Sequence, residues 1–154
     1  MPYELRNADI LMISLVKDPA TGRQVIFKSR DGQPDFGRTV QFAKADDEKQ
    51  IVYGIAYPAG SPEKTDAHGD FATPAEVAAM AARFMRNART VAGVDRDHDY
   101  RAMKGVTVVE SWIVRQGDPL FGNPEDVGAW AVGVHIEDKS LYDEFKKTGY
   151  RGFS

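Results

Sequence analysis

The three histidines are the main candidates for chemistry, because imidazole can move protons and ligate metals near neutral pH. His98 lies between a predicted helix and a predicted strand, and Asp95, Asp97 and Asp99 surround it in the sequence. Neighbouring carboxylates favour the imidazolium and orient the ring, which suits a base that becomes cationic when it accepts a proton. A solvated acidic turn has the same composition, and composition alone favours that simpler interpretation.

The other two histidines give weaker signals. His68 lies in an Asp-x-His-x-Asp triplet with Asp66 and Asp70, which could offer a metal ion three ligands. Loop carboxylates beside glycine more often form turns, so the metal interpretation is the minority one and we expect neither a metal nor another cofactor. His135 occupies a predicted strand with its apolar residues on the opposite face, so we expect it on a solvated face.

None of the serines lies in the Gly-x-Ser-x-Gly pattern of a nucleophile elbow. Helix capping explains Ser140, whereas Ser111 lies in a predicted strand beside Glu110 and is either buried or lines a site. Ser154 follows a Gly-Phe pair at the end of the sequence, and spacing alone does not single it out. The chain has no cysteine, which excludes thiolate catalysis, disulfides and Cys-ligated zinc.

The composition is that of an ordinary globular protein. The 154 residues suit a single domain, residues 1–154, with 42% hydrophobic and 28% charged residues. A net charge of −3 gives no basic field for nucleic acid or an anionic membrane, so we expect neither as a partner. No apolar run approaches the ~18 residues of a membrane span.

Hydrophobic periodicity predicts several strands and two helices. Thr73, Pro74 and Glu76 form a capping-box pattern that begins a helix ending near residue 90, and Asp138 can cap a helix over 139–147. The predicted strands cover residues 10–16, 23–28, 39–42, 50–57, 106–114, 129–137 and 150–154. We therefore expect an α+β fold, a small and mostly antiparallel β-barrel, closed or half-closed, with two main helices packed around it.

A series of short blocks along the chain resembles the phage prohead serine proteases of the XkdF-like group, which are similar in turn to the assemblin-type proteases of herpesviruses. No single block is decisive, but their number and order are specific to the group. The blocks are ISLVKDPA at 13–20, IVYG at 51–54, Asp66 with GDF at 69–71, ARFM at 82–85, DHD at 97–99, VVESWI at 108–113, GAWAVGV at 128–134 and GYRGFS at 149–154.

The resemblance implies a Ser/His endopeptidase that matures phage heads. His98 matches the histidine of the group and Ser154 the serine of its Gly-Phe-Ser block, 56 residues further along the chain. His98 would act as the base and Ser154 as the nucleophile of an acyl transfer. The implied substrates are the phage scaffold and major capsid proteins, inside the assembling prohead in the host cytoplasm. The resemblance also admits cleavage of the protease by itself and self-association.

The sequence departs from the group at its end, because Ser154 is the last residue and related chains continue beyond the serine. A third triad member is expected beyond this point. We therefore expect the domain to be truncated and this form to be weakly active or inactive. Asp97, Asp99 and Glu110 are the residues present that could orient His98, and none is favoured. Two alternatives remain: a non-catalytic head or scaffold-associated module, and a metal-dependent protein using the triplet that contains His68.

Overall fold

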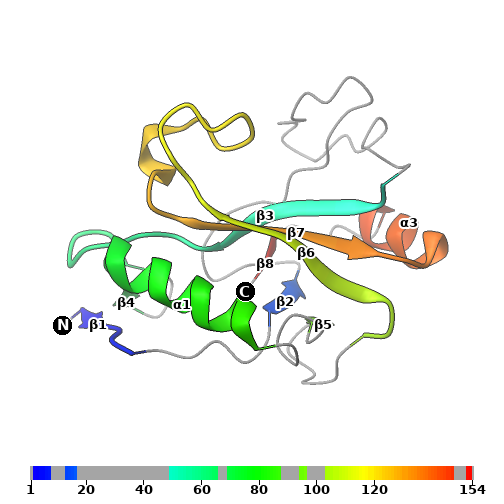
Figure 1. Ribbon diagram of the computed structural model, residues 1–154, viewed down its shortest axis with the longest axis horizontal. Coiled ribbons are helices and arrows are strands. Elements are labelled where there is room, and N and C mark those ends of the chain that lie inside the picture. Colours follow the sequence, from blue (N-terminus) through cyan, green and yellow to red (C-terminus); the bar gives the residue numbers. More distant parts are fainter. Residues whose placement is uncertain are drawn as a thin grey trace.

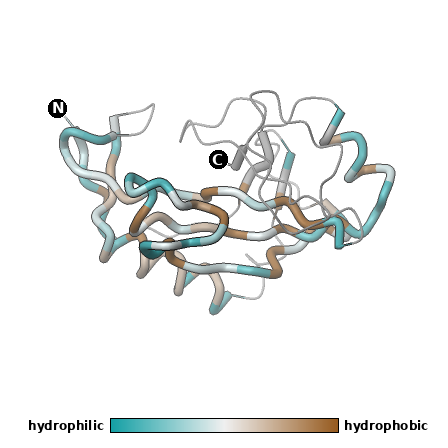
Figure 2. The backbone as a smooth tube through the Cα atoms, turned by 90° about the horizontal axis from the view of Figure 1, so that it is seen from above, coloured by the Kyte–Doolittle hydropathy of each residue, from teal (hydrophilic) through white to brown (hydrophobic). Residues whose placement is uncertain are grey.

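The computed structural model describes residues 2–7, 13–16, 49–65, 69–87, 94–96, 103–147 and 152–153. The strands predicted at 23–28 and 39–42 lie outside these ranges. The largest sheet has three strands and lies at the centre of Figure 1, with α1 and α3 toward opposite ends of it. Along the chain, Figure 2 shows apolar residues concentrated on the strands of this sheet and hydrophilic residues on many of the turns between elements.

The central sheet is antiparallel, with the strand order β3-β7-β6. β3 covers Ile51–Tyr57, β6 covers Val106–Ile113 and β7 covers Trp130–Ile136, each close to its predicted bounds. β7 is the middle strand, and all of its residues except His135 are buried. The sheet therefore has a covered surface on both sides of β7.

A β-bulge in β6 decides which side chains reach each face of this sheet. Val108 pairs with Val134 but Glu110 pairs with Gly133, so Val109 is the extra residue. Strict alternation from the buried Val108 would send Glu110 into the core. The extra residue reverses the phase and places Glu110 on the other face, which spares the core an ionised carboxylate.

Two further sheets are formed by short strands. β2 (Ile13–Val16) lies between β5 (Val94–Arg96), to which it is parallel, and β8 (Gly152–Phe153), to which it is antiparallel. β1 (Tyr3–Glu4) pairs in parallel with β4 (Asp70–Phe71). β1, β4 and β5 were not predicted, because strands this short have too few residues for a periodic pattern.

Both predicted helices are present. α1 covers Pro74–Arg86, and the Thr73 side chain accepts a hydrogen bond from the Glu76 amide at 3.3 Å, as the capping box requires. α1 ends before the predicted residue 90, since Asn87 already has an extended backbone. α3 covers Lys139–Lys147, and Asp138 caps it by accepting from the amides of Ser140 and Leu141.

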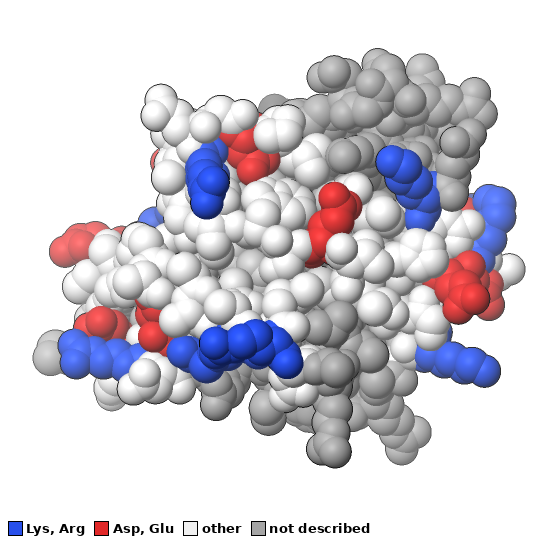
Figure 3. All heavy atoms as spheres, in the orientation of Figure 1, with Lys and Arg blue, Asp and Glu red and all other residues white. Residues whose placement is uncertain are grey.

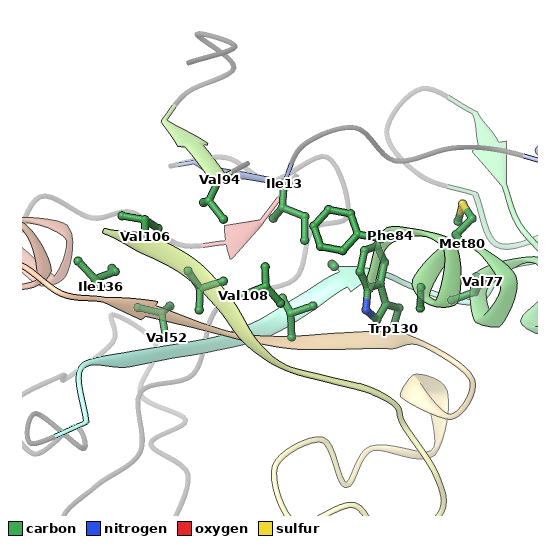
Figure 4. Close-up of a cluster of buried hydrophobic side chains, with 14 of the residues drawn as sticks. Ile13, Val52, Val77, Met80, Phe84, Val94, Val106, Val108, Trp130 and Ile136 are labelled. Carbon is green, nitrogen blue, oxygen red and sulfur yellow. The ribbon is translucent and has the colours of Figure 1, made fainter. Parts of the chain in front are cut away.

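The main core lies between the two three-stranded sheets. The rings of Phe84 from α1 and Trp130 from β7 meet edge to face with their centroids 5.1 Å apart, and Ile13 and Val94 of the smaller sheet belong to the same cluster (Figure 4). Tyr142 and Phe145 of α3 are fully buried in the same cluster. The core thus joins both sheets and both helices into one body.

The six strands of these two sheets follow a barrel-like order around the core. β5 contacts β6, and β8 contacts β3, so the edges of the sheets approach each other on both sides. Among the described residues no hydrogen-bonded ladder crosses either junction. The α+β class with two main helices and an antiparallel sheet is confirmed, whereas closure into a barrel stays a prediction. No α-helix within the described ranges is both long and apolar enough to cross a bilayer.

Candidate active site

The described backbone next to the two predicted catalytic residues converges on one residue of β2. Arg96, at the end of β5, and Phe153, at the end of β8, both pair with Leu15 from opposite sides. Two strand spacings of about 4.8 Å put these two backbones about 10 Å apart. His98 follows Arg96 by two residues and Ser154 follows Phe153 by one, and both lie outside the described residues.

The segment that contains His98 begins and ends at anchored positions. At its start, the Arg96 guanidinium lies 3.1 Å from a Glu144 oxygen and 4.8 Å from the centre of the Phe145 ring, so α3 holds the end of β5. At its far side, the Met103 amide donates to the Val94 carbonyl at 2.8 Å. The described residues flanking 97–102 are therefore tied to each other and to α3.

Glu110 and Ser111, which the sequence left as candidates beside the site, lie on opposite faces of β6, and the bulge at Val109 decides which face each takes. The Ser111 hydroxyl accepts a hydrogen bond from the Trp130 indole at 2.9 Å, so the Ser111 side chain lies on the face of β6 that borders the main core. Glu110 lies on the outer face across Gly133, where an added Cβ would come within 3.0 Å of its carboxylate and of the Tyr53 ring. The other two candidates for orienting His98, Asp97 and Asp99, lie outside the described ranges.

The outer face of the central sheet corrects the expectation made for His135. That face is not simply solvated: an apolar cluster covers much of it, formed by Tyr53, Ile55, Val114, Leu120, Phe121, Ala129 and Ala131. The loop that connects β6 to β7 supplies part of this cover. His135 itself is half-buried, between Ile51 and Thr107 in the register.

The metal-ligand triplet is described at one position only. Asp70 lies in β4 and pairs with Tyr3, whereas Asp66 and His68 fall outside the described residues. Within the part of the chain that the structure describes, no three His, Asp or Glu side chains gather as a metal site would require.

Asp118 organises the β6–β7 loop, and sequence reasoning missed it. One carboxylate oxygen accepts from the Trp112 indole at 2.7 Å, and the other accepts from the amides of Leu120 and Phe121, both at 2.9 Å. This is the local side-chain to backbone pattern of an Asx turn, for which an Asp followed by Pro is a recognisable signal. Sequence spacing alone gives no sign that the Trp112 indole donates to Asp118.

The sequence comparisons place the chain in a protease family. A family model described as "Putative phage serine protease XkdF" matches residues 39–154, about three quarters of the sequence and the part that contains both His98 and Ser154. The chain belongs to this family.

Two proteins of Bacillus subtilis (strain 168) are similar to the whole chain. The "Uncharacterized protein YqbD" is 36% identical over 155 residues, which make up 46% of that protein, and the "Phage-like element PBSX protein XkdF" is 32% identical over 156 residues, 54% of its length. The chain thus spans about half the length of these curated relatives. No solved structure matched the chain with significance.

Proposed function

We propose that this chain contains the Ser/His machinery of a serine endopeptidase that acts in phage head maturation. The supporting observation is the family match, which covers both His98 and Ser154. The geometry is compatible with it, because the strands that precede these residues, β5 and β8, flank the same residue of β2.

In the proposed reaction, His98 takes the hydroxyl proton of Ser154 as the serine oxygen attacks the scissile carbonyl. The histidine then donates this proton to the leaving amine, and an ester joins the substrate acyl group to Ser154. Water, deprotonated by His98, hydrolyses the ester and restores the serine. A carboxylate or a second polar group must orient His98, and Asp97, Asp99 or a residue beyond position 154 would supply it.

The proposed substrates are the scaffold and major capsid proteins of the phage, with the protease itself as a further substrate. The place of action would be the assembling prohead in the host cytoplasm. A fixed scaffold suits such chemistry, since nucleophile and base must be held within hydrogen-bond reach, about 2.6–3.2 Å. Closure of the two sheets into a barrel would fix β5 and β8 relative to each other and is part of the proposal.

The test is covalent labelling of the product of the complete reading frame by a fluorophosphonate probe. We expect labelling at Ser154, lost in both Ser154→Ala and His98→Ala, with cleavage of co-expressed scaffold protein lost in the same two variants. Ser140→Ala is the matched control, because Ser140 is an exposed residue at the start of α3. Far-UV circular dichroism of each variant checks that it is folded.

The absence of any labelling on the folded product would reject catalysis. The remaining interpretation would be a protease-like module that serves the head without chemistry. Labelling of another serine, unaffected by His98→Ala, would reject the assignment of the two residues while leaving the family membership intact.

A further inference from the structure

The side chain of Arg96 connects the end of β5 to α3. Its guanidinium Nη2 lies 3.1 Å from the Glu144 Oε1, and its central carbon lies 4.8 Å from the centre of the Phe145 ring. The Phe145 ring is fully buried in the main core, so it gives the guanidinium a fixed surface. A planar guanidinium can pair with a carboxylate and lie over a ring at the same time, which a lysine ammonium does less well.

This contact joins the two chain segments that lead to the proposed catalytic residues. His98 follows Arg96 by two residues, whereas α3 leads into β8, and Ser154 follows Glu144 by ten residues. In the smaller sheet, as far as the structure describes it, the backbones of β5 and β8 are connected through β2, which lies between them. The Arg96 side chain is a second connection between the same two segments.

The end of β5 that precedes His98 is the end that this contact holds. β5 has three residues and, within the described ranges, pairs with β2 alone. Its first residue, Val94, is buried, and the Val94 carbonyl accepts from the Met103 amide at 2.8 Å. Its last residue, Arg96, is held through its side chain by α3. Strand ends open more readily than buried strand centres, so this contact opposes opening next to His98.

We propose that Arg96 is a positioning residue of the peptidase: by bridging Glu144 and Phe145, it fixes the chain that carries His98 against the helix that leads to Ser154. This role rests on the proposed function. The base and the nucleophile must be held at about 2.6–3.2 Å, and a misplacement of about 1 Å can cost about 100-fold in rate. Arg96 therefore acts on the reaction through His98 and does not itself touch the substrate.

The rate of fluorophosphonate labelling at Ser154, in the product of the complete reading frame, tests this role. Figure 3 shows acidic and basic side chains at the surface of the end of the molecule where α3 lies in Figure 1, and the Glu144 side chain is 47% exposed. Glu144→Gln removes the charge and keeps the shape, so the fold should persist. We expect the labelling rate at saturating probe to fall about threefold to tenfold in Glu144→Gln, and about tenfold or more in Arg96→Gln, which also loses the ring contact.

Arg83→Gln is the matched control. Arg83 pairs with Glu76 on α1 at 2.9 Å, and its side chain is 28% exposed against 33% for Arg96. This variant loses a comparable ion pair on the other helix, so we expect its labelling rate to stay within about twofold of the parent rate. Far-UV circular dichroism checks the fold of each variant, and Glu144→Gln decides the question if Arg96→Gln is unfolded.

The pH dependence of labelling separates positioning from a direct effect of charge. Arg96→Gln removes a positive charge and Glu144→Gln a negative one, so a direct electrostatic effect on His98 would move the midpoint of the pH profile in opposite directions. A loss of positioning lowers the plateau of the profile in both variants.

Several results would overturn the proposal. Labelling rates within about twofold of the parent rate in both Glu144→Gln and Arg96→Gln would reject the positioning role and leave the proposed function standing. An equal loss of rate in Arg83→Gln, or opposite midpoint displacements with an unchanged plateau, would do the same. No labelling of the parent protein would reject the proposed function, and the positioning role with it.

Discussion

Substitution of Asp118 should measure how strongly the β6–β7 loop is fixed to the outer face of the central sheet. Asp118→Ala removes three hydrogen bonds at once, one to the Trp112 indole and two to backbone amides. Leu120 and Phe121, whose amides lose their acceptor, belong to the outer apolar cluster. The change therefore frees the segment that covers this face.

The size of the effect follows from the charge of the acceptor. Hydrogen bonds to an ionised group contribute about 1.5–3 kcal/mol each, but these three share one side chain and are not additive. Because Asp118 is partly exposed, we expect a total loss of about 2–4 kcal/mol in the free energy of unfolding. Asp118→Asn keeps an oxygen for the amides but turns an NH₂ group toward the indole donor, so it should cost about 1–3 kcal/mol.

Urea unfolding followed by far-UV circular dichroism gives these energies, and the emission maximum of Trp112 should shift to longer wavelength as the loop opens. Asp143→Ala is the control, because its ion pair with Lys139 is on the surface, and it should change stability by about 0.5 kcal/mol or less. A midpoint for Asp118→Ala equal to that of Asp143→Ala would refute the assigned role of the network.

Three further substitutions test the packing of the same sheet and α1. Gly133→Ala should cost about 1–3 kcal/mol in urea unfolding, because the new Cβ would come within 3.0 Å of the buried Tyr53 ring, and a neutral result would mean that the ring can move. Ser111→Ala should cost about 1–3 kcal/mol by leaving the buried Trp130 indole without its acceptor, and Ser111→Thr should recover part of the loss. Thr73→Ala should lower the thermal midpoint through a loss of about 1 kcal/mol at the helix cap, whereas Thr73→Ser should match the parent protein.

The junctions between the two three-stranded sheets involve the strands that precede the two proposed catalytic residues. Their edges meet at β5 with β6 and at β8 with β3, and those junctions involve the strands that lead to His98 and Ser154. Anchors at Arg96 and Met103 hold the described ends of the His98 segment. Arg96 at the end of β5 thus contacts α3, a connection that the sequence gave no reason to expect.

Much of the architecture followed from the sequence because its signals are local. The cap at Thr73 begins α1, Asp138 begins α3, and the apolar runs at 51–57 and 130–136 form strands close to their predicted bounds. Each of these depends on residues within a few positions of one another, so periodicity and capping chemistry are sufficient.

Only the tertiary structure decided the features that depend on pairing between strands far apart in the sequence. The bulge at Val109 exists because β6 is matched residue by residue to β7, and it alone sends Glu110 outward and Ser111 to Trp130. Likewise β5 has three residues and no pattern, and becomes a strand because β2 accepts it as a neighbour. Residue types and local spacing determined the longer elements of this protein, whereas the register between strands distant in sequence decided which side chains meet, because that register is set by the packing of the whole core.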